Sequence, residues 1–239
     1  MAWSTVLLDL ERNRYFGIGT HEARALLTLA ENWCDAAVQA APLEKLSSSS
    51  AAELADALVA AGFLSRQPPV FRLRTEPVEL GGVLRSAGHE LQARPRLRPA
   101  LLCDFLRSLA WARRALRSRS LYSIACEVSS RKERSPAEFD EARAIELIDA
   151  FRRLRPHAFA AKDKCLLHAL ALTNFLARQG VQATWVIGVR PRPWSAHSWV
   201  QQGTLLLDAS PEQVCEYTPI LAVRGAASDT ESASRRERK

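Results

Sequence analysis

The stretch KDKCLLHALALTNFLARQG at residues 162–180 predicts the helix around which the rest of the fold is built. Leu, Ala and Phe dominate the positions after Cys165, and Gly180 stands where such a helix would end. Cys165 therefore falls in or just before the first turn, facing the positive end of the helix dipole. Lys162 and Lys164 add positive charge nearby, and both influences favour thiolate over thiol. This placement is typical of a nucleophilic cysteine.

After this helix the pattern changes to strands, predicted at 182–189, 196–201 and 204–208. A two-residue turn at Gln202-Gly203 would make His197 and Asp208 direct cross-strand partners, with Cβ atoms about 5 Å apart. The same register points Ser198 and Val200 inward, opposite two leucines of the last strand. We therefore expect an imidazole and a carboxylate to be aligned on one face of a half-buried hairpin.

A thiol at a helix start, an imidazole on a strand and a carboxylate that orients it are the parts of a Cys-His-Asp hydrolase or acyl transferase. Cys165, His197 and Asp208 are the candidate catalytic residues. His168, one helical turn after Cys165, is a candidate for supporting them. The alternative is structural, because a lone cysteine at a helix start and a histidine beside Trp199 are each more often core residues.

The rest of the chain predicts four regions. Residues 1–66 read as a strand pair, 3–10 and 14–18 joined at 11–13, followed by helices starting near Thr20 and Ser50. Residues 67–99 are rich in Pro, Gly and Arg and are predicted to be a linker. Residues 100–223 form the catalytic domain, with helices from Ala100 and from about Pro136, and residues 224–239 form a charged tail.

The formal charge of +7 suggests nucleic acid until it is divided along the chain. Residues 1–84 carry −3 and residues 85–155 carry +7, so the segment most like a DNA-binding fold is acidic. The arginines of the middle stretch are most simply a solvated helix face. We therefore expect no nucleic acid partner.

The sequence lacks the signals of membrane-spanning, secreted, disulfide-bonded and metal-binding proteins. No apolar run approaches the ~20 residues of a membrane span, and the N-terminus lacks a secretory pattern, so we expect a cytoplasmic protein without a membrane partner. Five cysteines without CxxC spacing argue against a disulfide framework or a zinc site. With no metal spacing and no glycine-rich phosphate loop, we expect no bound cofactor; whether the reaction depends on ATP stays open.

Residues 160–223 resemble the transglutaminase-like cysteine peptidase of lasso peptide biosynthesis, the B protein. The resemblance rests on a helix opening with Cys-Leu, a strand ending Gly-Val-Arg at 188–190, a Pro-aromatic-x-x-His-x-Trp-Val segment at 193–200 and the later Asp. It implies that Cys165 is the nucleophile, His197 the general base and acid, and Asp208 its orienting partner. Trp194 stands where the family usually has Phe, and it is assigned with Trp199 to the substrate pocket.

The front of the chain resembles the recognition element that binds leader peptides of ribosomally made, modified peptides, a small winged-helix domain. The resemblance rests on VLLDLERNRYFGIG at 6–19 and Gly-Phe-Leu at 62–64. It implies that an extended leader adds to the edge of the hairpin and packs against a helix. The implied leader contacts are Arg14, Tyr15, Phe16, Ile18, Leu54 and Leu58. For Leu54 and Leu58, simple core packing is an equally good interpretation.

Together the resemblances imply an α+β protein: a winged-helix-like recognition domain followed by a transglutaminase/papain-like peptidase domain, with helices packed on an antiparallel sheet. The implied function is a leader peptidase that hydrolyses the leader–core bond of a lasso precursor. The implied partners are that precursor and an ATP-dependent, asparagine-synthetase-like cyclase. Two rivals stay open: an acyl transferase that uses the same triad, and a non-enzymatic winged-helix regulator that binds DNA.

Overall fold

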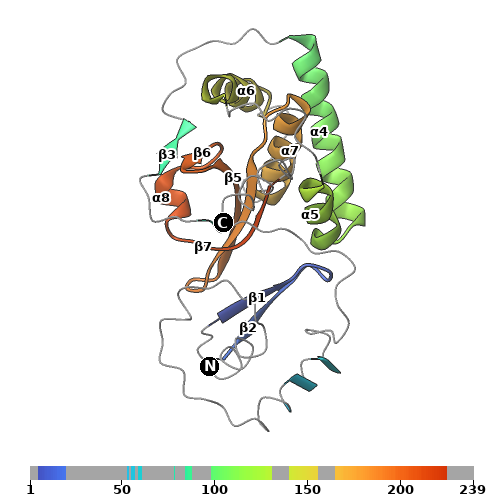
Figure 1. The fold of residues 1–239 in the computed structure, drawn as a ribbon, viewed down its shortest axis with the longest axis vertical. Coiled ribbons are helices and arrows are strands. Elements are labelled where there is room, and N and C mark those ends of the chain that lie inside the picture. Colours follow the sequence, from blue (N-terminus) through green and yellow to red (C-terminus); the bar gives the residue numbers. More distant parts are fainter. Residues whose placement is uncertain are drawn as a thin grey trace, which may run out of the picture. The chain divides into compact units, whose positions relative to one another are not determined.

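The computed structural model describes residues 5–19, 84–87, 98–130, 140–155 and 165–224, together with residues 53, 55, 56, 59, 60 and 78 (Figure 1). The chain divides into two compact units, Met1–Arg72 and Leu73–Lys239, and each is described by itself. The five described positions between 53 and 60 are helical, in line with the helix expected to start near Ser50. The helix expected from Thr20 and all of the tail except Arg224 lie outside the described residues.

The longest described segment of the first unit forms an antiparallel hairpin of β1 (Thr5–Asp9) and β2 (Arg14–Ile18). Leu7 lies opposite Phe16 and Asp9 lies opposite Arg14, so the two strands pair along their whole length. The strands and the connection predicted at 11–13 are confirmed.

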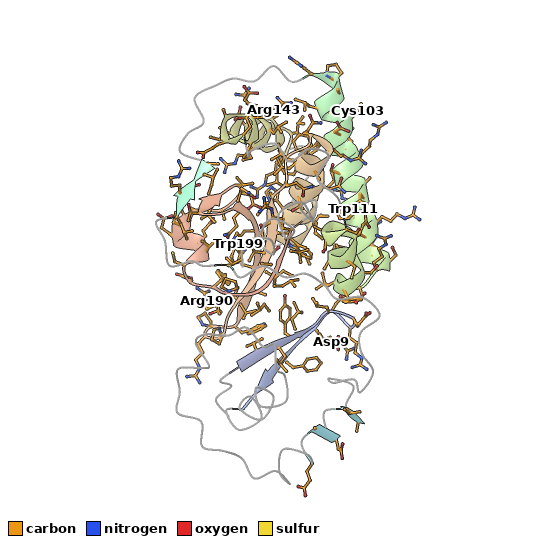
Figure 2. The ribbon with its side chains drawn as sticks, viewed as in Figure 1. Asp9, Cys103, Trp111, Arg143, Arg190 and Trp199 are labelled. Carbon is orange, nitrogen blue, oxygen red and sulfur yellow. The ribbon has the colours of Figure 1, made fainter. Side chains whose placement is uncertain are left out.

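Local hydrogen bonds explain why the hairpin turns after β1. Oδ1 of Asp9 accepts the backbone N–H groups of Glu11 and Arg12, both at 3.0 Å, at the turn end of the hairpin (Figure 2). Asp commonly stabilises turns by accepting such hydrogen bonds from nearby backbone N–H groups. Asn13 has a φ of 55°, a left-handed conformation that Asn tolerates better than most residues.

The second unit contains a five-stranded sheet with the order β3-β6-β5-β4-β7. Its strands are β3 (Arg85–Ser86), β4 (Thr184–Arg190), β5 (Ser195–Gln202), β6 (Leu205–Leu206) and β7 (Thr218–Val223). All neighbours are antiparallel except β3 and β6, which are parallel. The sequence predicted β4, β5 and β6 but missed β3 and β7. Residues 85–86, placed in the predicted linker, are instead a strand of this sheet.

Within its described residues, five helices accompany the sheet: α4 (Pro99–Ser118), α5 (Leu121–Ser129), α6 (Glu141–Leu154), α7 (Cys165–Arg178) and α8 (Pro211–Val214). Figure 1 shows α7 between the sheet and α4, and α7 contacts β5, β4, α4 and α6. This arrangement confirms the predicted fold class of the second unit, with helices packed on a largely antiparallel sheet. No described helix is both long and apolar enough to span a bilayer.

The helix ends follow from local chemistry. Ser120 and Asp140 cap α5 and α6 by accepting the backbone N–H groups of Ser123 and Arg143. The helix expected from about Pro136 therefore begins at Glu141 in the structure. Gly180, with a φ of 79°, follows the end of α7, where the sequence predicted the stop.

Six of the seven residues of β4 and four of the eight residues of β5 are buried, and the core lies on both faces of the sheet. On one face Trp199 packs with Val186, Leu206, Ala209, Val214 and Ala222, which places α8 over that face. Among the helices, the ring of Phe151 on α6 contacts Phe105 of α4 and Phe175 of α7, with centroids 5.1 and 5.5 Å apart. This aromatic cluster fixes α7 relative to α4 and α6.

Candidate active site

Cys165 is the first residue of α7 and is partly exposed. The first N–H groups of a helix have no acceptor inside it, and no acidic side chain stands in the first turn of α7. A negative charge on a sulfur at this position would lie at the positive end of the helix dipole. Lys162 and Lys164, which the sequence added to this argument, lie outside the described residues. Among the described cysteines, Cys165 alone opens a helix that packs on the sheet.

The carboxylate of Asp208 is held by two hydrogen bonds. Its Oδ1 accepts the backbone N–H of Val200 at 2.7 Å, and its Oδ2 lies 3.2 Å from Nδ1 of His168 on α7. An ionised carboxylate only accepts hydrogen bonds, so Nδ1 of His168 must carry the proton of this pair. Both side chains are nearly excluded from water, with exposures of 9% for His168 and 5% for Asp208.

The register predicted for the hairpin of β5 and β6 is wrong by two residues. Gln202 pairs with Leu205, so the turn is Gly203-Thr204 and not Gln202-Gly203. Asp208 is consequently not opposite His197, and no hydrogen bond joins these side chains within the described residues. A two-residue shift leaves every side chain on its face, because strand alternation has a period of two. His197 and Asp208 thus change from direct to diagonal neighbours.

Turn chemistry explains the shift. Gly203 has a φ of 55°, and Thr204 is not among the described residues with positive φ. This is the pattern of a type II′ turn, which places Gly at the first central position. Putting Gly203 at the second position, as the sequence prediction did, demands a left-handed conformation from Gln202.

The imidazole of His197 on β5 lies among aromatic rings. Its centroid is 6.0 Å from the ring of Trp199, nearly parallel to it, and 5.3 Å from the ring of Tyr217. Burial lowers the pKa of His197, the charge of Asp208 opposes that shift, and His168 reinforces it. His197 is therefore predominantly neutral at pH 7, as a general base must be. The electrostatic influence of Asp208 reaches His197 without a direct hydrogen bond.

Arg152 on α6 is a charged neighbour that the sequence did not point to. Its guanidinium donates to the backbone carbonyl of Leu207 at 3.3 Å, next to Asp208. Burial lowers the pKa of Arg152, and the charge of Asp208 opposes that shift. Its position near the end of the helix expected from about Pro136 gave no signal of this role.

The two tryptophans assigned to the substrate pocket differ in exposure. Trp194 is 45% exposed at the connection between β4 and β5, where a side chain can meet a ligand. Trp199 is fully buried and lies inside the second unit (Figure 2). Its Nε1 donates to Oε1 of Gln201 at 2.6 Å. Assigning Trp199 to a surface that meets substrate is therefore wrong, since its ring packs in the core and against His197.

The implied leader contacts lie in the first unit. Arg14 and Tyr15 on β2 are exposed and Phe16 is half-buried, whereas only the backbone of Ile18 is described. Leu54 and Leu58 lie outside the described residues. No group of three His, Cys, Asp or Glu side chains that could hold a metal ion occurs within the described parts of the chain.

Comparisons with known proteins add two findings. A family model described as the transglutaminase-like superfamily matches residues 103–222. The chain is 30% identical over 84 residues to the Microcin J25-processing protein McjB of Escherichia coli, a match covering 35% of this chain and 40% of that protein. These findings support the resemblance to the lasso peptide B protein. No solved structure matches the chain.

Proposed function

Because the chain belongs to the transglutaminase-like superfamily, we propose that it is a cysteine peptidase that removes the leader from a lasso peptide precursor. The observation that carries the proposal is the placement of Cys165 at the start of α7, one helical turn before the buried His168–Asp208 pair, with His197 on the strand against which α7 packs. The similarity to a microcin-processing protein supports a precursor peptide as the substrate.

The proposed reaction has two halves. His197 accepts the thiol proton of Cys165 as the sulfur attacks the carbonyl carbon of the leader–core bond. His197 then gives this proton to the departing core amine, the C–N bond breaks, and the leader remains as a thioester. Water, deprotonated by His197, attacks the thioester, and the sulfur leaves and regains its proton. The backbone N–H of Cys165 is our candidate for stabilising the oxyanion.

In this reaction Cys165 and His197 must meet when the substrate binds. No hydrogen bond joins them in the structure within the described residues. Catalytic hydrogen bonds are often long in a free enzyme and tighten only in the substrate complex. The neutral state that burial favours for His197 suits it to the first proton transfer.

The hairpin of the first unit is the proposed capture site for the leader. An extended peptide that adds as a further strand gains backbone hydrogen bonds from the hairpin edge and contacts side chains such as Tyr15 and Phe16. Tethering the leader there raises the local concentration of the scissile bond at Cys165. The released core has a free amino terminus, which the implied asparagine-synthetase-like cyclase would join to an acidic side chain.

Mass spectrometry of a lasso precursor incubated with the protein tests this function. We expect wild type to release leader and core, Cys165→Ala and His197→Ala to release neither, and Cys103→Ala to behave as wild type, because Cys103 is an exposed cysteine on α4. Equal cleavage by Cys165→Ala would end the proposal. In the presence of a free amine, an amine adduct of the leader in place of the hydrolysed acid would indicate an acyl transferase. Salt-dependent DNA binding with an intact precursor would indicate a regulator.

A further inference from the structure

The contact between His168 and Asp208 has no place in the triad described above. It joins α7 to the segment after β6, 40 residues away in sequence, at 3.2 Å. The ring of His168 also packs edge-on against Phe151 of α6, with centroids 5.3 Å apart. A buried imidazole is costly unless it is hydrogen-bonded, so Asp208 compensates for placing His168 in an apolar helix.

Both oxygens of Asp208 are engaged, which fixes the plane of the carboxylate. Leu207 donates its N–H to the carbonyl of Val200 at 2.9 Å, as in an antiparallel ladder. The N–H of Val200 then donates to Asp208 Oδ1, so the carboxylate continues the ladder where β6 has ended. Oδ2 is left to His168. Without that second anchor, the side chain could rotate about the remaining hydrogen bond.

Resting on the proposed function, we propose that His168 is a positioning residue, which holds Asp208 in the orientation from which the carboxylate acts on His197. An ionised carboxylate has about four lone-pair sites, and two are used here, so Asp208 can accept a third bond from His197 in the substrate complex. His168 thereby shares one carboxylate with the catalytic imidazole and ties it to the helix that carries the nucleophile.

The charged and titratable groups around this pair come from four places in the fold. Cys165 shares α7 with His168, Arg152 comes from α6, His197 from β5 and Asp208 from the segment after β6. The negative charge of Asp208 raises the pKa of His197, whereas His168 lowers it. Removing the His168 ring while Asp208 stays in place therefore moves the pKa of His197 upward, whereas releasing Asp208 from its orientation moves that pKa downward.

Two variants separate a positioning role from a catalytic one. His168→Leu fills the space but has no donor, whereas His168→Asn offers an amide N–H near the position of Nδ1 and cannot exchange protons near pH 7. Thr173→Val is the matched control. Its hydroxyl is buried on the same helix and bonds only the carbonyl of Ala169, at 2.8 Å.

The readouts are kcat/KM for precursor cleavage against pH and an NMR titration of the histidine ring signals. For His168→Leu we expect kcat/KM to fall by about 10-fold or more, through kcat, and the pKa of His197 to lie below its value in His168→Asn, because only the Asn variant keeps Asp208 in place. His168→Asn should keep kcat/KM within about 3-fold of wild type, and Thr173→Val should change neither quantity. That result supports positioning, because Asn restores the contact without a titrating ring.

Three outcomes would overturn the inference. One is a His168→Leu enzyme with wild-type kcat/KM and the same His197 titration as His168→Asn. Another is a His168→Asn enzyme as inactive as Cys165→Ala, which would make His168 itself the base. The third is a Thr173→Val enzyme as impaired as His168→Leu, which would indicate loss of helix packing alone. A wild-type protein that cleaves no precursor would refute the proposed function instead, and the titration would still report whether His168 governs His197.

Discussion

Replacing Gly188 by Ala should damage both stability and activity, because this glycine lies beneath the aromatic ring that supports His197. Gly188 pairs with His197 across β4 and β5. A Cβ added at Gly188 would lie 2.7 Å from two ring carbons of Trp199 and 3.0 Å from Cβ of Tyr217. Carbon atoms prefer about 3.5–4.0 Å, so the neighbours must move by roughly 1 Å.

The indole of Trp199 has little room to move, since it is fully buried and hydrogen-bonded to Gln201. Overpacking of this kind costs about 1–3 kcal/mol. For a unit of this size, each kcal/mol lowers Tm by about 2–4 °C, so we expect Gly188→Ala to lower Tm by about 2–12 °C. Because Trp199 and Tyr217 flank His197, precursor cleavage measured at a temperature where the variant is folded should fall as well.

Gly180→Ala is the matched control for this prediction. Gly180 has a φ of 79° and nothing within 4 Å of an added Cβ, so alanine there strains the backbone without crowding a neighbour. Gly180 follows the C-terminal end of α7, whereas Cys165 begins the helix. We expect it to cost about 1–2 kcal/mol of stability while leaving the cleavage rate of the folded protein unchanged. Thermal unfolding followed by circular dichroism and cleavage followed by mass spectrometry measure both. Wild-type Tm and wild-type cleavage in Gly188→Ala would refute the packing argument.

The other predictions concern the reacting groups. Cys165→Ala should abolish cleavage yet bind a labelled leader peptide as tightly as wild type, which fluorescence polarisation can check. Asp208→Asn should lower kcat by at least about 10-fold, because its amide can still accept from Val200 but can no longer accept from His168 in the same orientation; steady-state kinetics measures this. Since the pKa of His197 lies below its usual 6.5, kcat/KM should hold down to that pH and decline only as pH falls through the lowered pKa. A decline centred above pH 6.5 would contradict the neutral resting imidazole.

Local signals were sufficient to predict α7 and the first hairpin. An apolar periodic run that ends at Gly180 specifies a helix from nearest neighbours alone, and the two short strands beside Asn13 need only turn chemistry and β-formers. The pairing of β3 with β6 could not be predicted in this way. Arg85 and Ser86 occupy a Pro- and Gly-rich segment, and their strand exists because β6, some 120 residues later, offers an edge.

The position assigned to Gly203 in the turn determines the register of the whole hairpin of β5 and β6. Placing Gly203 second instead of first in the turn preserved the faces of both strands, so Ser198 and Val200 are buried as predicted although the pairing was wrong. The expectation of a half-buried hairpin was wrong, because Trp199 and Leu206 on the other face are also buried. The predicted contact between His197 and Asp208 was most sensitive to this error. A hydrogen bond between side chains requires direct neighbours, whereas burial requires only the correct face of the strand.

The electrostatics of the site follow from this geometry. A histidine whose pKa is lowered by burial is a ready base but does not hold a proton well, and the second transfer, to the leaving amine, needs a held proton. Asp208 supplies the opposing influence, and its effect depends on orientation as well as charge. Anchoring Asp208 from α7 means that the element carrying Cys165 also sets the proton affinity of His197. In the proposed mechanism, a displacement of α7 relative to β5 would consequently alter the nucleophile and its base together, through the buried contact between His168 and Asp208.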